Sequence, residues 1–156
     1  MSTTGLLRSV QKQGVALSVS IAEPLLDADV IIWLLRGDKP TADLVRKFQA
    51  ESLPGCSVIT LFEVKAGMRP SEAPVTEEFL QSLTHYEVTA AIVDQAATYY
   101  RALRAQGITL DLPDLIVAAT AKTHRLTIVT YNRAHFPMPD LTLYPVDPPK
   151  GKPRRK

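Results

Sequence analysis

The sequence predicts one α/β domain built on a parallel sheet with helices on both faces. Short β-like apolar runs alternate with longer runs of helical periodicity, which is the pattern of repeated strand–helix units. The chain has 156 residues, enough for one domain with a substantial core, and its 46% apolar and 22% charged composition is typical of a globular protein. No internal repeat or low-complexity linker interrupts the alternation.

The predicted elements follow from apolar spacing and from breakers such as Gly37, Pro70 and Gly107. Leu44, Val45 and Phe48, for example, have helical spacing. The expected strands cover residues 25–26, 55–59, 86–88, 126–130 and, at one edge, 141–144. The expected helices cover residues 30–35, 41–51, 60–68, 77–83, 90–105 and 112–124.

Charge and cysteine content exclude several classes of protein. The net charge is +2, from 18 Lys/Arg and 16 Asp/Glu, which is too small to indicate a polyanion partner by itself. The single cysteine, Cys56, excludes an internal disulfide and fits the reducing cytoplasm. No run reaches the roughly 18 apolar residues of a membrane span. We expect a folded domain over residues 24–147, an extension over 1–23 and a basic disordered tail over 148–156.

Polar residues follow the predicted strands at three places. Asp27 comes directly after the first strand, Thr60 with Glu63 after the second, and Thr130 with Asn132 after the fourth. Functional groups in an open parallel sheet gather beyond the carboxyl ends of the strands, so these side chains should meet at one edge. Asp114, in the first turn of a predicted helix, can reach the same edge.

Each acid except Asp27 also has a simple structural explanation. Asp29 could cap the first helix, and Thr60 with Glu63 matches a capping box. Asp111 and Asp114 have the same spacing, with a proline in the first turn. Together, however, carboxylates at one sheet edge repel each other unless a cation neutralises them. Carboxylate oxygens and water are the ligands that Mg²⁺ and Mn²⁺ prefer.

The sequence gives little support to other kinds of active site. The three histidines, His85, His124 and His135, are scattered and lack zinc spacing. There is no glycine-rich dinucleotide fingerprint, no P-loop and no Gly-x-Ser-x-Gly elbow. A divalent-metal site is therefore the leading hypothesis.

Three blocks of sequence resemble the PIN-domain family, and most of all its VapC-type toxins from bacterial toxin–antitoxin pairs. They are LLDADVIIWLLRGD, SVITLFEVKAGM and LPDLIVAATAKTHRLTIVTYNRAHF, in that order, and the resemblance spans residues 25–146. It implies a three-layer α/β/α sandwich with a central parallel sheet.

The resemblance also implies a site. Three family acids correspond to Asp27, Glu63 and Asp114, which would be catalytic and bind Mg²⁺ or Mn²⁺. Thr130 would support these acids, and Asn132 stands where many members carry a fourth Asp. The first block departs from the usual Asp-Thr-(Ser/Asn), because Ala28 and Asp29 follow Asp27. We hypothesise that Asp29 supplies the charge that Asn132 lacks, which makes both candidate metal ligands.

The family activity is hydrolysis of RNA by a metal-activated water, leaving a 3′-hydroxyl and a 5′-phosphate. The resemblance implies a cytoplasmic endoribonuclease acting on tRNA, rRNA or mRNA. It also implies a homodimer, a cognate antitoxin and no membrane partner. An acidic centre must still attract RNA, so basic residues should surround it. The candidates are Arg36, Lys65, Arg69 and Arg133.

Two alternatives stay open. One is a PIN-fold module that binds RNA or protein with a weakened site, since Ala28 and Asn132 depart from the family pattern. The other is a phosphatase of the haloacid dehalogenase type, with Asp27 as nucleophile and Asp29 as acid/base, although Val30 and Ile31 replace its usual Gly-Thr.

Overall fold

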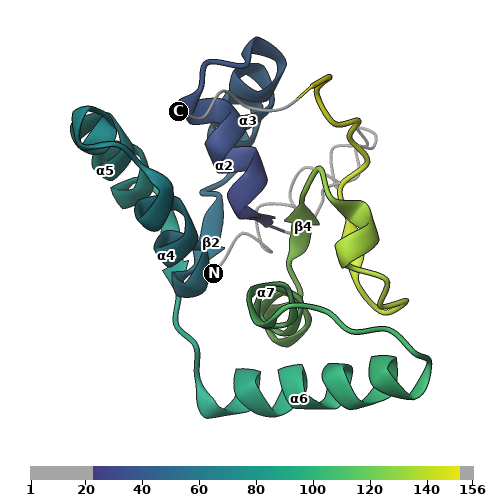
Figure 1. The fold of residues 1–156 in the computed structure, drawn as a ribbon. Helices are drawn as coiled ribbons and strands as arrows, with labels where there is room; N and C mark the ends of the chain where they lie inside the picture. Colours follow the sequence, from purple (N-terminus) through teal and green to yellow (C-terminus); the bar gives the residue numbers. More distant parts are fainter. Residues whose placement is uncertain (1–22, 152–156) are drawn as a thin grey trace, which may run out of the picture.

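The computed structural model describes residues 23–151, and its centre is a five-stranded sheet in which every pair of neighbours is parallel (Figure 1). The strand order is β3–β2–β1–β4–β5. From β1 the chain therefore adds strands first on one side and then, from β4, on the other. The strands are β1 (Pro24–Leu26), β2 (Gly55–Ser57), β3 (Thr84–Tyr86), β4 (Thr127–Val129) and β5 (Thr142–Leu143).

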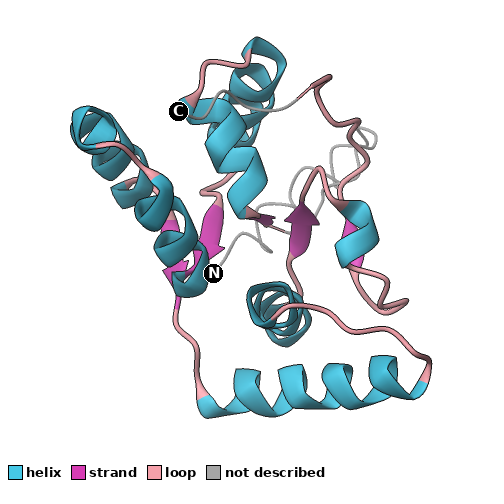
Figure 2. Ribbon diagram, viewed as in Figure 1, coloured by secondary structure: helices cyan, strands magenta, loops and turns pink. Residues whose placement is uncertain are grey.

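Helices cover both faces of this sheet, which confirms the predicted α/β sandwich (Figure 2). Helices α6 and α7 lie on one face, and α2 and α3 on the other, with α4 and α5 beside them. The α-helices are α2 (Ala28–Leu35), α3 (Lys39–Glu51), α4 (Val58–Gly67), α5 (Ala73–Gln81), α6 (Ala90–Ala105) and α7 (Leu112–His124). Two short 3₁₀ turns are η1 (Pro70–Glu72) and η2 (Arg133–His135).

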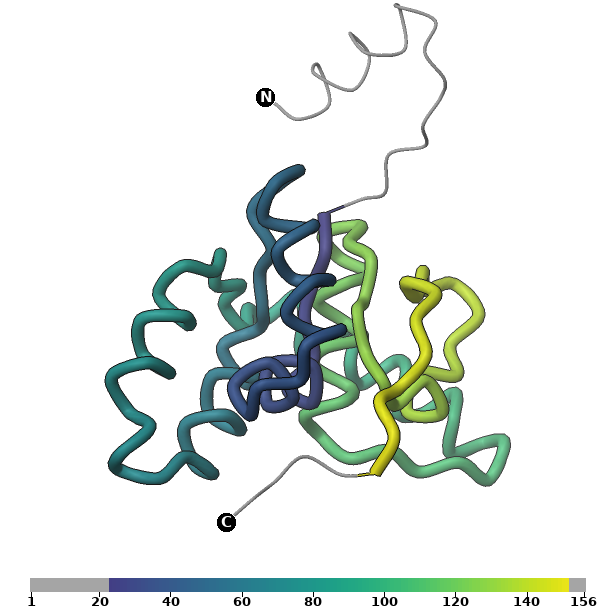
Figure 3. The backbone as a smooth tube through the Cα atoms, turned by 90° about the horizontal axis from the view of Figure 1, so that it is seen from above, coloured from purple at the N-terminus to yellow at the C-terminus, as the bar shows by residue number. Residues whose placement is uncertain are grey.

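The core is divided between the two faces by strand alternation. Leu25 and Ile128 pack with α6 and α7, whereas their neighbours Leu26 and Val129 pack with the helices of the opposite face. All four side chains are fully buried. Because successive side chains of a strand point to opposite faces, two adjacent leucines anchor β1 in both cores. Seen from above, α5 and the segment after β4 lie on opposite sides of the molecule (Figure 3).

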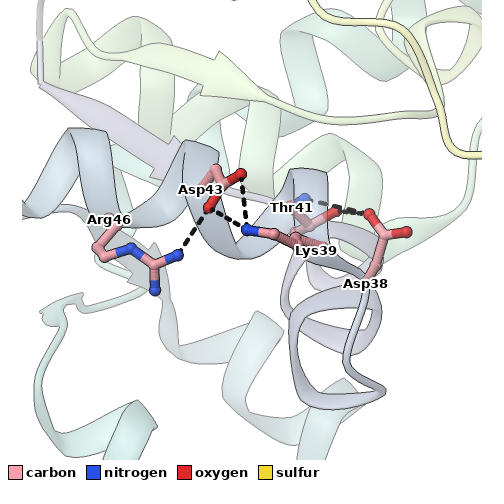
Figure 4. A network of polar contacts seen from close by, with 5 residues as sticks. All are labelled: Asp38, Lys39, Thr41, Asp43 and Arg46. Carbon is pink, nitrogen blue, oxygen red and sulfur yellow. Dashed lines mark hydrogen bonds and ion pairs between the residues drawn. The ribbon is translucent and has the colours of Figure 1, made fainter.

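Helix α3 begins at a capped and charged turn (Figure 4). The Asp38 carboxylate accepts hydrogen bonds from the Thr41 backbone N–H at 3.1 Å and from the Thr41 hydroxyl at 2.6 Å. On the exposed side of the same helix, Asp43 pairs with Lys39 at 3.4 Å and Arg46 at 2.7 Å. The buried Thr41 hydroxyl also lies 2.7 Å from the Tyr131 hydroxyl, which ties α3 to the segment after β4.

Several predicted boundaries were displaced. The second strand ends at Ser57, not at residue 59, because the Ser57 side chain accepts from the Ile59 N–H and starts α4 early. The expected helix at 77–83 begins at Ala73, with Pro74 in its first turn. None of the helices between residues 23 and 151 has the length and apolar character to cross a bilayer. The expected extension and tail lie outside the described residues, apart from Glu23 and residues 148–151.

Candidate functional site

The carboxyl edge of the sheet brings the predicted segments together between β1 and β4. Asp27 follows β1 and Thr130 follows β4, and these two strands are neighbours in register from Pro24–Thr127 to Leu26–Val129. The direction of strand addition reverses between β1 and β4, and open α/β sheets place their binding sites at such a reversal. This is the edge that the sequence predicts.

Asp27 is the most buried acid of the site, with 5% of its surface exposed. One carboxylate oxygen, Oδ1, accepts from the Ala28 N–H at 2.9 Å, and Oδ2 accepts from the Thr130 hydroxyl at 2.8 Å. The expectation that capping explains Asp27 poorly was wrong. Helix α2 starts immediately after β1, so one residue both ends the strand and caps the helix.

Asp29 is not the helix cap that the sequence suggests. It lies in the first turn of α2, and its Oδ2 accepts from the Tyr131 N–H at 3.1 Å. Its other oxygen, Oδ1, is buried and has no hydrogen-bond partner within residues 23–151. A buried carboxylate oxygen without a partner is costly, and such an atom is expected where a ligand is missing. Ala28, the residue before it, is buried, and its side chain carries no polar atom.

The expected capping box of Thr60 and Glu63 was also wrong, because Ser57 caps α4 one turn earlier. Thr60 is fully buried, and its hydroxyl has no hydrogen-bond partner in the described part of the chain. Glu63 lines a cavity of about 120 Å³ between α2, α4 and α5, together with Arg36 and Glu72. Glu63 thus approaches the site from the side of α4.

Asp114 lies in the first turn of α7, and the Asp111 side chain makes no capping bond there, so this capping box was wrong as well. The Asp114 Oδ2 atom instead lies 3.2 Å from Nδ1 of His135, in η2. Sequence reasoning missed His135, since a contact between residues 21 positions apart leaves no spacing signal. Asn132, from the same segment, is exposed and donates its backbone N–H to the Thr130 hydroxyl at 2.9 Å.

Burial raises the pKa of all four acids, and repulsion by neighbouring carboxylates raises it further at Asp29, Glu63 and Asp114. Burial is the main cause at Asp27, where the hydrogen bond from Thr130 opposes it. Burial and the charge of Asp27 raise the pKa of Asp29 to about 7 and that of Asp114 to about 6. The pKa of Glu63 is raised by burial and then by Asp27 and Asp114. Four acids that disfavour each other's charge form one electrostatic unit.

The chemistry of this donor set fits a hard divalent cation, but its present spacing does not close around one. Carboxylate oxygens predominate, and the unpartnered Oδ1 of Asp29 is buried among them. Within residues 23–151, however, no three acidic, histidine or cysteine side chains lie close enough to hold one metal ion together. A cation would therefore draw at least one of these side chains inward.

The predicted RNA-binding cations each have a protein partner. Arg36 pairs with Glu72 at 2.8 Å, and Arg69 lies 3.9 Å from the same carboxylate. Lys65 lies 3.3 Å from Glu77. Arg133 donates to the Tyr144 carbonyl at 3.0 Å.

The sequence matches the PIN domain family over residues 25–138, and the chain belongs to this family. It is 31% identical over 130 residues to Ribonuclease VapC10 of Mycobacterium tuberculosis, covering 83% of this chain and 98% of the relative. Ribonuclease VapC19 of the same organism is 32% identical over 120 residues, or 75% and 95% of the two chains. This membership replaces the phosphatase interpretation.

Solved structures share the fold. A chain in the structure of VapBC2 from Rickettsia felis, bound to a promoter DNA fragment, has a TM-score of 0.71 and 18% identity, over 78% of this chain and 96% of that one. A chain in a toxin–antitoxin complex from Klebsiella pneumoniae has a TM-score of 0.68 and 24% identity, over 80% and 99%. The predicted PIN-like sandwich is thus confirmed.

Proposed function

We propose that this chain is a VapC-type toxin, an endoribonuclease that hydrolyses RNA phosphodiester bonds. The observation that carries the proposal is the group of four acids with raised pKa values, Asp27, Asp29, Glu63 and Asp114, at the strand-order reversal of a PIN fold. Two ribonuclease relatives that align over most of the chain support the same activity.

The proposed cofactor is Mg²⁺ or Mn²⁺, held by Asp27, Glu63 and Asp114, with Asp29 and Asn132 as further candidate ligands. When bound, such an ion activates water and stabilises negative charge on the phosphate. The chain's own residues prepare the site for this role. The Thr130 hydroxyl and the Ala28 N–H each hold one oxygen of Asp27, and the Tyr131 N–H holds Oδ2 of Asp29, which leaves Oδ1 of Asp29 as the oxygen without a hydrogen bond among the described residues.

The basic residues around the site would guide RNA. Arg36 lines the same cavity as Glu63, which places it beside an acid of the site. Arg133 follows Asn132 in the segment after β4. Arg36, Lys65 and Arg69 lie beside carboxylates that offset part of their charge, whereas Arg133 contacts a neutral carbonyl and keeps its full positive charge for RNA.

The proposed partners are a cognate antitoxin and a second copy of this chain. Both structural neighbours described above come from toxin–antitoxin assemblies. An antitoxin would block the acidic site, which is needed because free ribonuclease activity is harmful to the cell that makes it. A cytoplasmic location accords with RNA as substrate and with the single buried thiol of Cys56.

The first experiment is cleavage of a pool of intact tRNA and rRNA by the purified protein without antitoxin. It is run with Mg²⁺ or Mn²⁺ and with EDTA, beside Asp27→Asn and Asp114→Asn. We expect discrete metal-dependent cuts that end in 5′-phosphate and fall at least about 10²-fold in both variants. Cleavage that survives both substitutions would contradict the assignment of the site. If the folded protein bound RNA but never cut it, the chain would be a binding module with a weakened site.

A further inference from the structure

One segment of six residues, Thr130 to His135, contacts three of the four acids. The Thr130 hydroxyl donates to Asp27, and the Tyr131 N–H donates to Asp29. At the end of the segment, Nδ1 of His135 lies 3.2 Å from Oδ2 of Asp114. The hydroxyl of Thr130 is itself oriented by the Asn132 N–H. The first two contacts follow the strand edge, but the contact of His135 reaches across to another helix.

His135 is the single hydrogen-bonding or ion-pairing partner of the Asp114 carboxylate among the described residues. Asp114 stands in the first turn of α7, where neither the Asp111 side chain nor a backbone group holds its carboxylate. Without His135, this side chain would be free to change rotamer. Asp27 and Asp29, by comparison, are each held by a hydrogen bond from the segment after β4.

The position of His135 does not depend on its own contact with Asp114. The turn is closed by hydrogen bonds from His135 N–H to the Asn132 carbonyl, at 2.9 Å, and from Phe136 N–H to the Arg133 carbonyl, at 3.0 Å. Phe136 is 3% exposed and packs in the core that contains α6 and α7. The imidazole is 50% exposed, whereas the Asp114 side chain is 17% exposed. Because the imidazole of this pair is half exposed to water, we expect the pair to contribute little to folding stability.

We infer that His135 is a positioning residue for Asp114: its Nδ1–H holds Oδ2, so that Oδ1 is the oxygen presented to the divalent ion. The inference rests on the proposed function, because it concerns how the same site holds its cation. Partners that orient a ligating carboxylate commonly change metal affinity by about 10–100-fold when they are removed.

Two isosteric substitutions of His135 test whether Nδ1 is the atom that holds Asp114. The amide nitrogen of Asn can replace Nδ1 of His135, whereas the amide nitrogen of Gln replaces Nε2. The test compares His135→Asn, His135→Gln and His135→Ala. A matched control is His124→Gln, because His124 ends the same helix that Asp114 begins and lies outside the site.

The first measurement is Mn²⁺ affinity of the RNA-free protein, by calorimetry or by electron paramagnetic resonance. We expect His135→Gln and His135→Ala to bind Mn²⁺ about 10–100-fold more weakly, and His135→Asn to stay within about 3-fold of the unsubstituted protein. The second measurement is RNA cleavage at low and at saturating Mn²⁺. The loss in the Gln and Ala variants should shrink at saturating metal, with KM for RNA unchanged. Circular dichroism and thermal unfolding verify that each variant is folded.

Each other result overturns the inference or separates it from the proposed function. Unchanged Mn²⁺ affinity in all three variants would overturn it. Retention by His135→Gln with loss in His135→Asn would also overturn it, because Nε2 would then be the functional atom. If the protein binds Mn²⁺ in this His135-dependent way but cuts no RNA, the positioning role stands and the ribonuclease proposal fails.

Discussion

Asp27, Asp29 and Asp114 are each contacted by the segment after β4, whereas Glu63 on α4 has no hydrogen bond or ion pair among the described residues. Glu63 instead lines a cavity with Arg36 and Glu72. The segment after β4 therefore holds three of the acids in place, whereas Glu63 is free to move.

This difference explains why the acids form one electrostatic unit and yet no compact ligand set. The three carboxylates that the segment after β4 contacts would lose those contacts on moving together, so we expect Glu63, which has none, to move inward when a cation binds. In a site of this kind, three carboxylates are already positioned before the cation binds, and the fourth moves to complete the ligand set. Preorganised groups lower the reorganisation needed when charge is neutralised.

Among changes that leave the four acids in place, a large effect should come from removing the hydrogen bond that Thr130 donates to Asp27. Thr130→Val keeps the shape of a fully buried side chain but deletes the hydroxyl that donates to Asp27. We expect about a 10–100-fold loss of cleavage and of metal affinity. Thr130→Ser restores the donor and should retain activity within about 3-fold. Equal losses in Val and Ser variants would mean that packing, not the hydrogen bond, is what matters.

The second prediction concerns stability without metal as a function of pH. Asp29 and Asp114 have pKa values of about 7 and about 6, above the 3.8 of an ordinary Asp. Between about pH 4 and pH 7 the folded protein therefore binds more protons than the unfolded chain, and its stability falls as pH rises. We expect the metal-free protein to lose about 1–2 kcal/mol, or about 3–6 °C in Tm, from pH 5 to pH 8.

Divalent metal and two variants sharpen this measurement. Mg²⁺ or Mn²⁺ should restore most of the lost Tm at pH 8, because the cation offsets the repulsion that the charged acids create. Asp29→Asn should flatten the pH profile more than Glu63→Gln, since Asp29 is the more deeply buried acid. A profile that is flat in the unsubstituted protein would contradict the braced, mutually repelling arrangement.

The bounds of an element were predicted best where the capping and helix-ending residues lie outside its apolar run. The helix from Ala90 to Ala105 has a Thr89 cap and a glycine just after its end, and its bounds were predicted correctly. The β2–α4 boundary failed because Val58 and Ile59 suit a strand, yet Ser57 caps a helix that starts with them. No loop separates the two elements, so the apolar run carries no sign of the change.

The acids of the site could be found from their places after strands, but their partners could not. Asp27, Glu63 and Asp114 each follow a signal that a sequence contains, either a strand end or a helix start. Which group holds each carboxylate depends on side-chain direction across tertiary contacts. The partnerships of His135 with Asp114 and of the Tyr131 N–H with Asp29 are both of this kind. Resemblance to a family supplied Thr130, because its neighbours in sequence match a known block.

The smallest effect should come from a substitution beside Glu63. Arg36, with 14% of its side chain exposed, pairs with Glu72 beside the cavity that Glu63 lines. Arg36→Met keeps most of the volume but removes the charge, so we expect a loss of about 0.5–1 kcal/mol, or about 1–3 °C in Tm. Arg46→Met, which breaks a pair on the exposed surface of α3, is the matched control and should not shift Tm measurably.

Metal affinity should not change in Arg36→Met, because Arg36 contacts none of the acids of the site. Unchanged metal affinity would support the view that three acids are held by the segment after β4 while Glu63 is mobile. A weaker Mn²⁺ affinity in Arg36→Met, with Arg46→Met unchanged, would instead mean that the Arg36–Glu72 pair positions Glu63 through the wall of the cavity. Glu63 would then be held in place like the other three acids. The spacing of the four acids, which is too wide for one metal ion, would need another explanation.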